Sequence, residues 1–337
     1  MTKKILIITD NLPDQINGVV TTYKNIEACA VLDGYTVDYI DPGRFRYVNC
    51  PRYHEVKIAY PRNLGAKIEE IAPDYIHIAT EGPLGLWARA YLALGDIRHN
   101  TAYHTKFPEG LKKLFGIPEF ITWRFVRWFH KHSGKVLTTT DSMVAELKAH
   151  GFNGEVIPWT RGVDRAIFHP GYRDRDDDRK VLLCVARVSK EKNLEDFFEL
   201  EYPKSRKIMV GDGPMLDKYK KQYPDVEFVG FKTGTELAEY YANADVFVFP
   251  SRWETFGIVM IEAMACGTPV AAYPCQGPED VVEAGVTGYL EQDLATAVHR
   301  CIGLNRDTVL AGSQRWSWAR AWEIFRDNLT PNHLWTK

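Results

Sequence analysis

The sequence lacks the features that mark several common classes of protein. It contains no run approaching the roughly 18–20 apolar residues that a membrane-spanning helix needs. Its formal net charge is -2 over 337 residues, so its overall charge does not favour nonspecific binding to a polyanion. We therefore expect neither a membrane-spanning protein nor a generally basic nucleic-acid-binding protein. The net charge does not exclude a local basic patch on the surface.

Cysteine is sparse and unpaired in the sequence. The cysteines stand singly at positions 29, 50, 184, 266, 275 and 301, and none forms a Cys-x-x-Cys pair. This spacing argues against a zinc site and favours buried free thiols in a reducing compartment. The apolar run near the amino terminus, residues 5–8, is too short for a signal sequence and reads as a strand. We expect a cytoplasmic protein.

A nicotinamide or flavin fingerprint is also missing. The first predicted strand-to-helix turn, residues 9–20, does not contain Gly-x-Gly-x-x-Gly. It does place Asn17 and Gly18 just before a predicted helix. Backbone amides at such a position can approach a diphosphate or a bound sugar, although many ordinary turns contain Asn-Gly.

The composition is that of a globular protein, with 45% hydrophobic and 26% charged residues. A chain of 337 residues suits two domains of about 150–180 residues each. Short apolar runs alternate with helical patterns, which predicts α/β architecture with parallel sheets covered on both faces and one doubly wound unit in each half. The predicted strands are 4–8, 36–40, 75–78, 136–139, 181–185, 206–210, 226–229, 245–249 and 269–272.

The domain boundaries follow from polarity. Residues 168–179 contain Pro, Gly and alternating charges, and we interpret them as a linker between domains 1–167 and 180–312. The remaining residues, 313–337, include a predicted helix in which Trp318, Trp322 and Phe325 share one face.

The most informative segment spans residues 251–270, which read as loop, short helix, turn and strand. Glu254 falls in the loop after a strand, and Glu262 about two turns into the helix. The amides of Thr255, Phe256 and Gly257, with Ile258 following, would open that helix and attract an anion. Two carboxylates that accept from sugar hydroxyls, beside such a helix start, indicate a nucleotide-sugar site. The alternative is a surface loop and an amphipathic helix.

Other candidates follow predicted strands of the second half. Arg187 and Lys192 come after one strand, where two cations can neutralise a departing diphosphate. Gly211, Gly213 and Gly230 lie in turns that can shape a nucleoside pocket, or are ordinary turns.

In the first half, His104 follows an extended segment. It is either a polar group that faces a cleft or a hydrogen-bonded structural histidine.

Taken together, these motifs resemble the retaining GT-B glycosyltransferases of family four. The resemblance rests on Glu254-x7-Glu262, Arg187 with Lys192, residues 211–214, residues 162–164 and residues 17–19. The residues at 103–105 and 17–19 are most similar to those of one subgroup, the α-mannosyl, glucosyl and sulfoquinovosyl transferases that act on membrane lipids. The sequence departs from many relatives in having Asn17 before Gly18 and Ala186 before Arg187.

The resemblance implies two Rossmann-like domains that face a cleft, with the last helix crossing back to the first domain. It implies that Arg187 and Lys192 hold the donor diphosphate and that Glu262 accepts from the ribose. It further implies that Glu254 and the amides of Phe256 and Gly257 contact the donor sugar. Gly18 would line the cleft and His104 would lie near the transferred sugar. We therefore take Arg187, Lys192, Glu254 and His104 as the candidate catalytic residues.

These roles predict transfer of a sugar from a UDP- or GDP-sugar to an acceptor hydroxyl with retained configuration. The nucleotide sugar is a co-substrate. We expect no cofactor and no metal ion, because side chains supply the positive charge. The alternatives are a non-catalytic sugar-nucleotide-binding module and an epimerase of the same fold.

The acceptor is suggested by residues 111–132, which are both basic and aromatic. Such a segment can lie at a membrane surface, which predicts a lipid acceptor such as diacylglycerol or a glycolipid on the inner face of the membrane. The same composition fits nucleic acid, so hydroxylated DNA bases are an alternative acceptor. A core helix with a solvated basic face is the third interpretation.

Overall fold

The computed structural model describes the chain except for residues 1, 51–52, 105, 176–177, 333 and 335–337. The chain divides into two compact units. The first unit contains Met1–Arg161 and Trp318–Lys337, and the second contains Gly162–Ser317. No helix among the described residues is both long enough and apolar enough to cross a membrane.

The first unit is built on a parallel six-stranded sheet with the order β2-β1-β5-β6-β7-β8. Its strands are β1 (Lys4–Ile8), β2 (Thr36–Ile40), β5 (Tyr75–Ile78), β6 (Asn100–Tyr103), β7 (Val136–Thr138) and β8 (Val156–Pro158). A separate antiparallel hairpin joins β3 (Arg46–Cys50) and β4 (Tyr53–Tyr60). The helices are α1 (Gly18–Leu32), α2 (Leu64–Ile71), α3 (Pro83–Leu94), α4 (Phe107–Phe115), α5 (Glu119–His130), α6 (Asp141–Ala149) and α14 (Trp318–Asp327).

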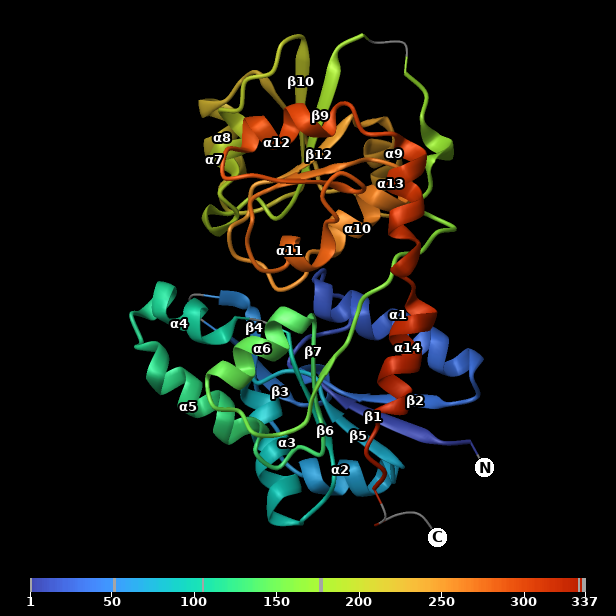
Figure 1. Cartoon of the computed structure of the whole chain (residues 1–337). Helices are drawn as coiled ribbons and strands as arrows, with labels where there is room; N and C mark the ends of the chain where they lie inside the picture. Colours follow the sequence, from blue (N-terminus) through green and yellow to red (C-terminus); the bar gives the residue numbers. More distant parts are fainter. Residues whose placement is uncertain (1, 51–52, 105, 176–177, 333, 335–337) are drawn as a thin grey trace. The chain divides into compact units, whose positions relative to one another are not determined.

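Both faces of this sheet are covered, as the sequence predicted (Figure 1). Successive residues of a strand point to opposite faces. In β1, Ile5 and Ile7 therefore pack in a cluster with α1 and α14, while Leu6 and Ile8 pack in a second cluster with α2 and α3. This two-sided burial explains why the strand is apolar throughout.

The last helix belongs to the first unit, and its aromatic stripe is buried. Trp318, Trp322 and Phe325 lie in the same cluster as Ile5 and Ile7. Two indole hydrogen bonds fix the helix: Trp159 Nε1 donates to the carbonyl of Ala321 at 2.9 Å, and Trp322 Nε1 donates to the Asp33 carboxylate at 2.9 Å. The predicted helix that crosses back to the first domain is thus confirmed.

The second unit repeats the architecture, with a parallel six-stranded sheet in the order β11-β10-β9-β12-β13-β14. Its strands are β9 (Lys180–Val185), β10 (Ser205–Val210), β11 (Val226–Gly230), β12 (Val246–Phe249), β13 (Val270–Ala272) and β14 (Gly288–Leu290). Its helices are α7 (Leu194–Phe198), α8 (Leu216–Gln222), α9 (Gly234–Asn243), α10 (Ile258–Ala265), α11 (Pro278–Val281), α12 (Leu294–Cys301) and α13 (Arg306–Gly312). Short 3₁₀ turns occur at Pro42–Arg44, Pro170–Tyr172, Lys190–Lys192 and Ser313–Arg315.

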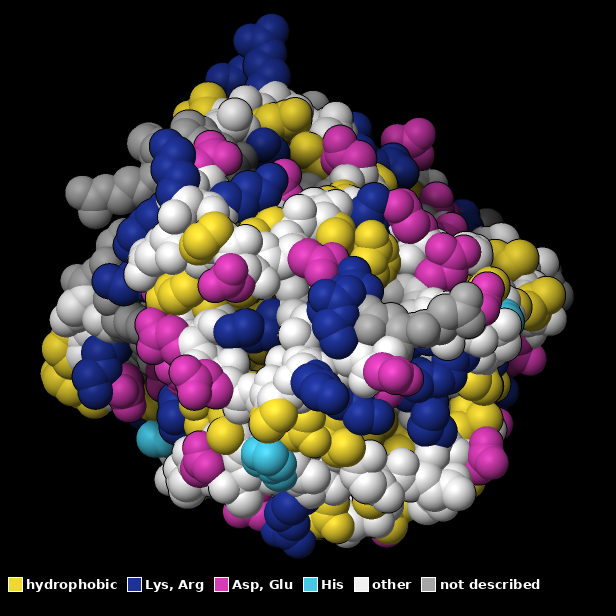
Figure 2. Space-filling view, turned by 90° about the horizontal axis from the view of Figure 1, so that it is seen from above, with side chains coloured by type: hydrophobic (Ala, Val, Ile, Leu, Met, Phe, Trp, Pro, Cys, Tyr) yellow, Lys and Arg dark blue, Asp and Glu magenta, His cyan; other side chains and the backbone are white. Residues whose placement is uncertain are grey.

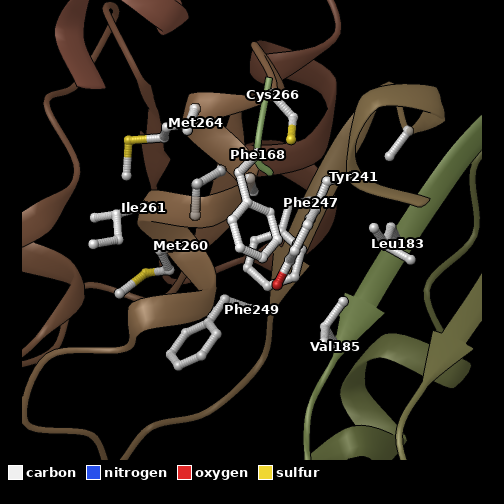
Figure 3. Close-up of a cluster of buried hydrophobic side chains, with 14 of the residues drawn as sticks. Phe168, Leu183, Val185, Tyr241, Phe247, Phe249, Met260, Ile261, Met264 and Cys266 are labelled. Atoms are coloured by element: carbon white, nitrogen blue, oxygen red, sulfur yellow. The ribbon is translucent and has the colours of Figure 1, made fainter. Parts of the chain in front are cut away.

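One core of the second unit lies between its sheet and helices α9 and α10 (Figure 3). Leu183 and Val185 of β9, together with Phe247 and Phe249 of β12, pack against side chains of these helices. On the surface face shown in Figure 2, basic side chains lie among acidic ones, which agrees with the small net charge.

The boundary between the units differs from the predicted linker. Phe168, the first residue of the predicted linker, is buried in the core of the second unit (Figure 3). Arg173 and Arg175 both pair with the Asp245 carboxylate, which also accepts from the Val181 amide at 2.8 Å. The described part of 168–179 therefore packs on the second unit. The chain passes between units at Arg161–Gly162 and at Ser317–Trp318.

The predicted strands are all present, with ends that differ by at most one residue, but several other strands were not predicted. In β6, Asn100 and Thr101 are polar although buried, because Asn100 donates to the carbonyl of Asn328 and Thr101 bonds His130. The described side chains of β3 are largely exposed, so this strand has no apolar alternation. β8 and β14 have only three residues each, too few for a recognisable pattern.

The packing of α14 generates a stability prediction. Phe325→Ala removes a fully buried ring from the first unit, and we expect the free energy of unfolding to fall by about 3–5 kcal/mol. Arg320→Ala, on the exposed face of the same helix, is the matched control and should change it by less than about 0.5 kcal/mol. Urea unfolding followed by tryptophan fluorescence measures both. Equal effects would contradict the burial of this helix face.

Candidate active site

The loops that follow the strands of the second unit are tied together by backbone hydrogen bonds. The Val188 amide donates to the carbonyl of Asp212 at 2.9 Å, and the Gly211 amide donates to the carbonyl of Gly230 at 2.9 Å. These bonds link the loops after β9, β10 and β11. The predicted glycines therefore lie with Arg187 at the carboxyl edge of the sheet, where parallel α/β sheets bind ligands.

Two of these positions require glycine because the backbone of a neighbouring loop lies very close to them. A Cβ atom on Gly211, whose φ is +144°, would lie 1.9 Å from the carbonyl oxygen of Ala186. A Cβ atom on Gly213 would lie 2.5 Å from the carbonyl oxygen of Val188. A side chain at either position would push away the loop that carries Arg187.

Lys192 and Glu254 meet directly, although they follow different strands. Lys192 lies at the end of the 3₁₀ turn after β9, and Glu254 lies in the loop after β12. Their side chains form an ion pair with Nζ and Oε2 at 3.0 Å, and each side chain is about a quarter exposed, at 25% and 22%. Attraction to Glu254 raises the pKa of Lys192 despite its burial, so the lysine stays charged.

The Glu254 carboxylate is also bound by the backbone that follows it. Oε1 accepts from the Thr255 amide at 3.0 Å, and the Phe256 amide also bonds this carboxylate. Burial acts to raise the pKa of Glu254, but Lys192 and these two amides together hold the pKa below its usual range. The amides of Thr255, Phe256 and Gly257 were predicted from the sequence to attract an anion. In the structure, the first two of these amides bond the Glu254 carboxylate.

The helix after this loop starts later than expected. α10 begins at Ile258, with Gly257 at φ +83° before it, so Glu262 lies just over one turn into the helix and not about two. A glycine at this positive φ breaks the helical path between Glu254 and Ile258. The loop therefore keeps Glu254 free of the helix and lets it reach Lys192.

Glu262 points to a different partner. Its Oε2 accepts from the Tyr241 hydroxyl of α9 at 3.0 Å. Burial raises the pKa of Glu262 to about 7, against the lowering effect of the Tyr241 bond. This carboxyl therefore changes its ionisation close to neutral pH. Arg187, in contrast, is exposed at the same edge of the sheet.

In the first unit, Asn17 caps the helix that Gly18 begins. The Asn17 Oδ1 accepts from the amides of Val19 and Val20, both at 3.0 Å, and its Nδ2 donates to Asn11 at 3.0 Å. This is the preferred chemistry of a helix start. Asn17 therefore holds the loop in place, and Gly18 is the first helical residue and does not precede the helix.

His104 is buried in a hydrogen-bonded network directly after β6. Its Nε2 is 3.0 Å from the Tyr23 hydroxyl and its Nδ1 is 2.9 Å from Arg161 Nη2. Burial, and then the charge of Arg161, hold the pKa of His104 well below its usual range, so the ring is neutral near pH 7. This geometry is that of a structural histidine. Contact with a sugar stays a prediction.

Sequence reasoning missed the residues that bind His104. Tyr23 lies on α1, Arg161 ends the first unit, and His77 of β5 continues the network with its Nε2 2.7 Å from the Tyr23 hydroxyl. Arg161 directly precedes the Gly162-Val163-Asp164 motif that the analysis did use. That adjacency was the only available signal, because the network joins residues distant in sequence.

Asp10, near the start of the loop after β1, was also missed. Its carboxylate accepts from the Leu84 amide at 2.6 Å and from the Thr80 hydroxyl at 2.7 Å, and so fixes the start of α3. Among the residues that the structure describes, no group of His, Cys, Asp and Glu has the arrangement of a metal site.

Comparison with known proteins assigns the family. The family described as "Glycosyl transferases group 1" matches residues 169–299, and "Glycosyltransferase Family 4" matches residues 17–167. A GDP-mannose-dependent alpha-mannosyltransferase of Mycolicibacterium smegmatis is 32% identical over 286 residues, which is 80% of this chain and 75% of that protein. The chain belongs to glycosyltransferase family four.

Two other relatives of this glycosyltransferase are named for the transfer or synthesis of other sugar products. The alpha-monoglucosyldiacylglycerol synthase of Streptococcus pneumoniae is 27% identical over 348 residues, covering 88% of this chain and 77% of the relative. The sulfoquinovosyl transferase SQD2 of Arabidopsis thaliana is 29% identical over 262 residues. That match covers 72% of this chain and 51% of the plant protein.

Solved structures agree with the fold of the glycosyltransferase. The sucrose-phosphate synthase of Thermosynechococcus elongatus has a TM-score of 0.76 at 19% identity, covering 96% of this chain and 94% of that one. The Anabaena protein HepE, in a complex with UDP, has a TM-score of 0.74 at 18% identity, covering 97% and 99%. The predicted GT-B fold is confirmed.

The Tyr241–Glu262 contact in the glycosyltransferase generates a pH prediction. Tyr241→Phe removes the one hydrogen bond that lowers the pKa of Glu262, so this pKa should rise above about 7. Carbon-13 NMR of labelled glutamate carboxyls measures the change. Tyr240→Phe, the neighbouring residue on α9, is the control and should leave the pKa of Glu262 where it is. A pKa that stays constant in both variants would show that the bond is not formed in solution.

Proposed function

We propose that this glycosyltransferase moves a sugar from a UDP- or GDP-sugar to a hydroxyl of a membrane lipid, with retention of the anomeric configuration. The observation that supports this most directly is the Lys192–Glu254 pair, which lies at the carboxyl edge of the second sheet beside the loop of Arg187. Glu262 lies on the helix that follows Glu254. Arg187, Lys192, Glu254 and Glu262 thus all lie on the second unit, whereas His104 and Gly18 lie on the first.

In this proposal, the main catalytic contribution is stabilisation of the negative charge that develops on the leaving diphosphate. Arg187 and Lys192 supply positive charge, and Lys192 is kept charged by Glu254. The sequence offers no convincing enzyme nucleophile, so we favour displacement on one face of the sugar with oxocarbenium character. Because the cations are side chains, the proposal requires no metal ion and no other cofactor.

Binding of the donor would rearrange the bonds of Glu254. In the ligand-free structure, its carboxylate holds Lys192 and two backbone amides. We propose that the diphosphate takes over Lys192 and that sugar hydroxyls donate to Glu254. The Gly257 and Ile258 amides at the start of α10 would then face the donor. Glu262 would accept from the ribose.

The proposed acceptor is a lipid such as diacylglycerol or a glycolipid. The supporting observation from the comparisons is that a relative covering most of this chain is named a monoglucosyldiacylglycerol synthase. Another is named a sulfoquinovosyl transferase. The mannosyltransferase relatives are named for GDP-mannose, so the names of the relatives do not choose among donors.

The exposed face of α5 supports contact with a lipid surface. Phe120, Ile121 and Trp128 are 73%, 48% and 45% exposed. Arg124 and Lys131 lie exposed between and beyond them. Aromatic and aliphatic side chains interspersed with cations suit the interface of an anionic membrane. The opposite face of α5 is buried, so the segment also contributes to the core.

These observations support a peripheral position on the inner face of the membrane. A purely basic solvated face, the plainest alternative, would not expose these three apolar side chains. A non-catalytic sugar-nucleotide-binding module would not need to retain all of Arg187, Lys192, Glu254 and Glu262. We therefore favour the enzyme.

The leaving-group role predicts a specific loss of activity. Lys192→Ala removes a cation from the diphosphate, so kcat should fall by about 10²–10³-fold. Lys190→Ala, an exposed lysine in the same 3₁₀ turn, is the matched control and should keep kcat close to that of the unaltered enzyme. Release of UDP or GDP in the presence of acceptor measures both. A Lys192→Ala enzyme within about tenfold of the unaltered enzyme would overturn the assignment.

The acceptor proposal predicts a gain in lipid mass. We expect mass spectrometry to show one added hexose-type unit on diacylglycerol or a glycolipid after incubation with a panel of UDP- and GDP-sugars. Phe120→Ser with Ile121→Ser should reduce flotation with anionic liposomes. Leu94→Ser, an exposed apolar residue on α3 (91% exposed), is the control and should not reduce it. Added mass on hydroxymethylated DNA in place of lipid would identify the other acceptor.

A further inference from the structure

A series of hydrogen-bonded polar side chains lies in the interior of the first unit. It connects one arginine to two histidine rings and one tyrosine ring. Arg161, His104, Tyr23 and His77 come from four separate segments, and their side chains are at most 8% exposed. Successive members are 2.9, 3.0 and 2.7 Å apart. The rings of Trp159 and Phe325 pack against this series, which keeps water from replacing its bonds.

The direction of the first bond follows from the chemistry of arginine. A guanidinium group only donates hydrogen bonds and stays protonated in proteins. The Arg161 Nη2 lies 2.9 Å from the Nδ1 of His104, so this nitrogen must be an acceptor and carries no proton. The proton of the neutral imidazole is then on Nε2.

The remaining bonds follow in sequence. The His104 Nε2 donates to the Tyr23 oxygen at 3.0 Å, which leaves the Tyr23 hydroxyl proton for the Nε2 of His77 at 2.7 Å. Arg161 thus sets the direction of the His104–Tyr23 bond, because Nε2 of the neutral ring must donate while Arg161 donates to Nδ1.

Arg161 is itself held in place. Its Nη1 donates to the carbonyls of Trp159 and Thr160 at 2.7 and 3.1 Å, and its guanidinium lies 4.6 Å from the centre of the Trp159 ring. Burial lowers the pKa of Arg161 to about 10, which still leaves it charged at neutral pH.

We propose that Arg161 is a positioning residue that holds His104 as the tautomer protonated at Nε2. In this state both ring nitrogens are occupied, Nδ1 by Arg161 and Nε2 by Tyr23, so His104 does not accept a proton from a sugar hydroxyl or an acceptor hydroxyl. The part of this inference that concerns the sugar rests on the proposed function. The part that concerns the tautomer rests only on the geometry of the first unit.

The charged and titratable groups around His104 support the same state. Arg161, His77 and His130 are the groups whose positive charge would disfavour a second proton on the ring, and Tyr23 occupies Nε2. Burial lowers the pKa of His77 to about 3, so this neighbour is neutral as well. Protonation of His104 at Nδ1 would require the Arg161 bond to break.

The direct test is NMR of the imidazole nitrogens and carbons in the full-length protein labelled with nitrogen-15 and carbon-13 histidine. The His104 signals are identified by their loss in His104→Gln. We expect Nδ1 to be unprotonated and Nε2 protonated, with no change between about pH 5.5 and 8. A wild-type spectrum with the proton on Nδ1, or with two interchanging tautomers, would overturn the proposal without any variant being needed.

Two variants test the role of Arg161. In Arg161→Met, the acceptor state of Nδ1 is no longer imposed, so the two tautomers should mix and His104 should titrate at a higher pH than in wild type. Arg161→Lys keeps a cationic donor and should restore the single tautomer. Arg165→Met, which removes an arginine bound to Ser313 in the second unit, is the control and should leave the His104 signals unchanged. An unchanged His104 tautomer in a folded Arg161→Met protein would also overturn the proposal.

Activity measurements on the same variants test the role of His104 in sugar transfer separately from its tautomer. The kcat for sugar transfer by Arg161→Met should vary with pH around the new pKa of His104, because the ring then gains a proton that Arg161 excludes in wild type, and Arg161→Lys should lose that dependence. A loss of kcat that is equal at every pH would show a merely structural role. The NMR result needs neither donor nor acceptor, so failure to find sugar transfer by the wild-type protein would overturn the proposed function and leave the tautomer assignment intact.

Discussion

Both sheets are parallel, and this constraint determines where chemistry is available in the molecule. In a parallel sheet every strand ends on the same edge, so loops that are far apart in the sequence meet there. Lys192 and Glu254 are separated by a large part of the second unit, yet they form an ion pair at that edge. Asp10, Asn17 and His104 follow strands of the first sheet in the same way. The positions of the candidate residues therefore follow from the sheet topology before any ligand is considered.

At this edge, polar groups of the protein already satisfy one another. Glu254 accepts from Lys192 and from the amides after it, and Glu262 accepts from Tyr241. Because a buried charge without partners is costly, these bonds keep the ionised groups in place when no ligand is bound. A diphosphate that approaches this edge exchanges existing bonds for new ones. Donor affinity thus reflects the difference in free energy between the bonds within the ligand-free protein and the bonds to the donor. Because these bonds are of similar kind, small changes in the loops can determine which sugar is preferred.

The sequence predicted those features whose pattern lies within a few consecutive residues, and it missed those that depend on contacts between residues distant in sequence. Apolar strands such as Lys4–Ile8 and the Glu254–Glu262 segment carry their pattern within a few residues, and their fold and placement on the sheet were predicted correctly. The late start of α10 was not, because it depends on the backbone angle of Gly257. The partners of His104 lie 57 to 81 residues away, and no spacing rule joins such positions. The segment with Arg173 and Arg175 was interpreted as a linker, because nothing in its own sequence indicates that both arginines pair with Asp245.

The return of α14 to the first unit has a consequence for the order in which the protein is made. The cluster around Ile5, Ile7 and Trp159 is completed only by Trp318, Trp322 and Phe325. During translation, one face of the first sheet is therefore covered by α1 but not yet by α14, while the whole second unit, residues 162–317, is available to fold as a unit of its own. Apolar surface of the first unit therefore stays exposed until α14 has been synthesised. The core that the first strand starts is thus completed only after the whole second unit has been synthesised.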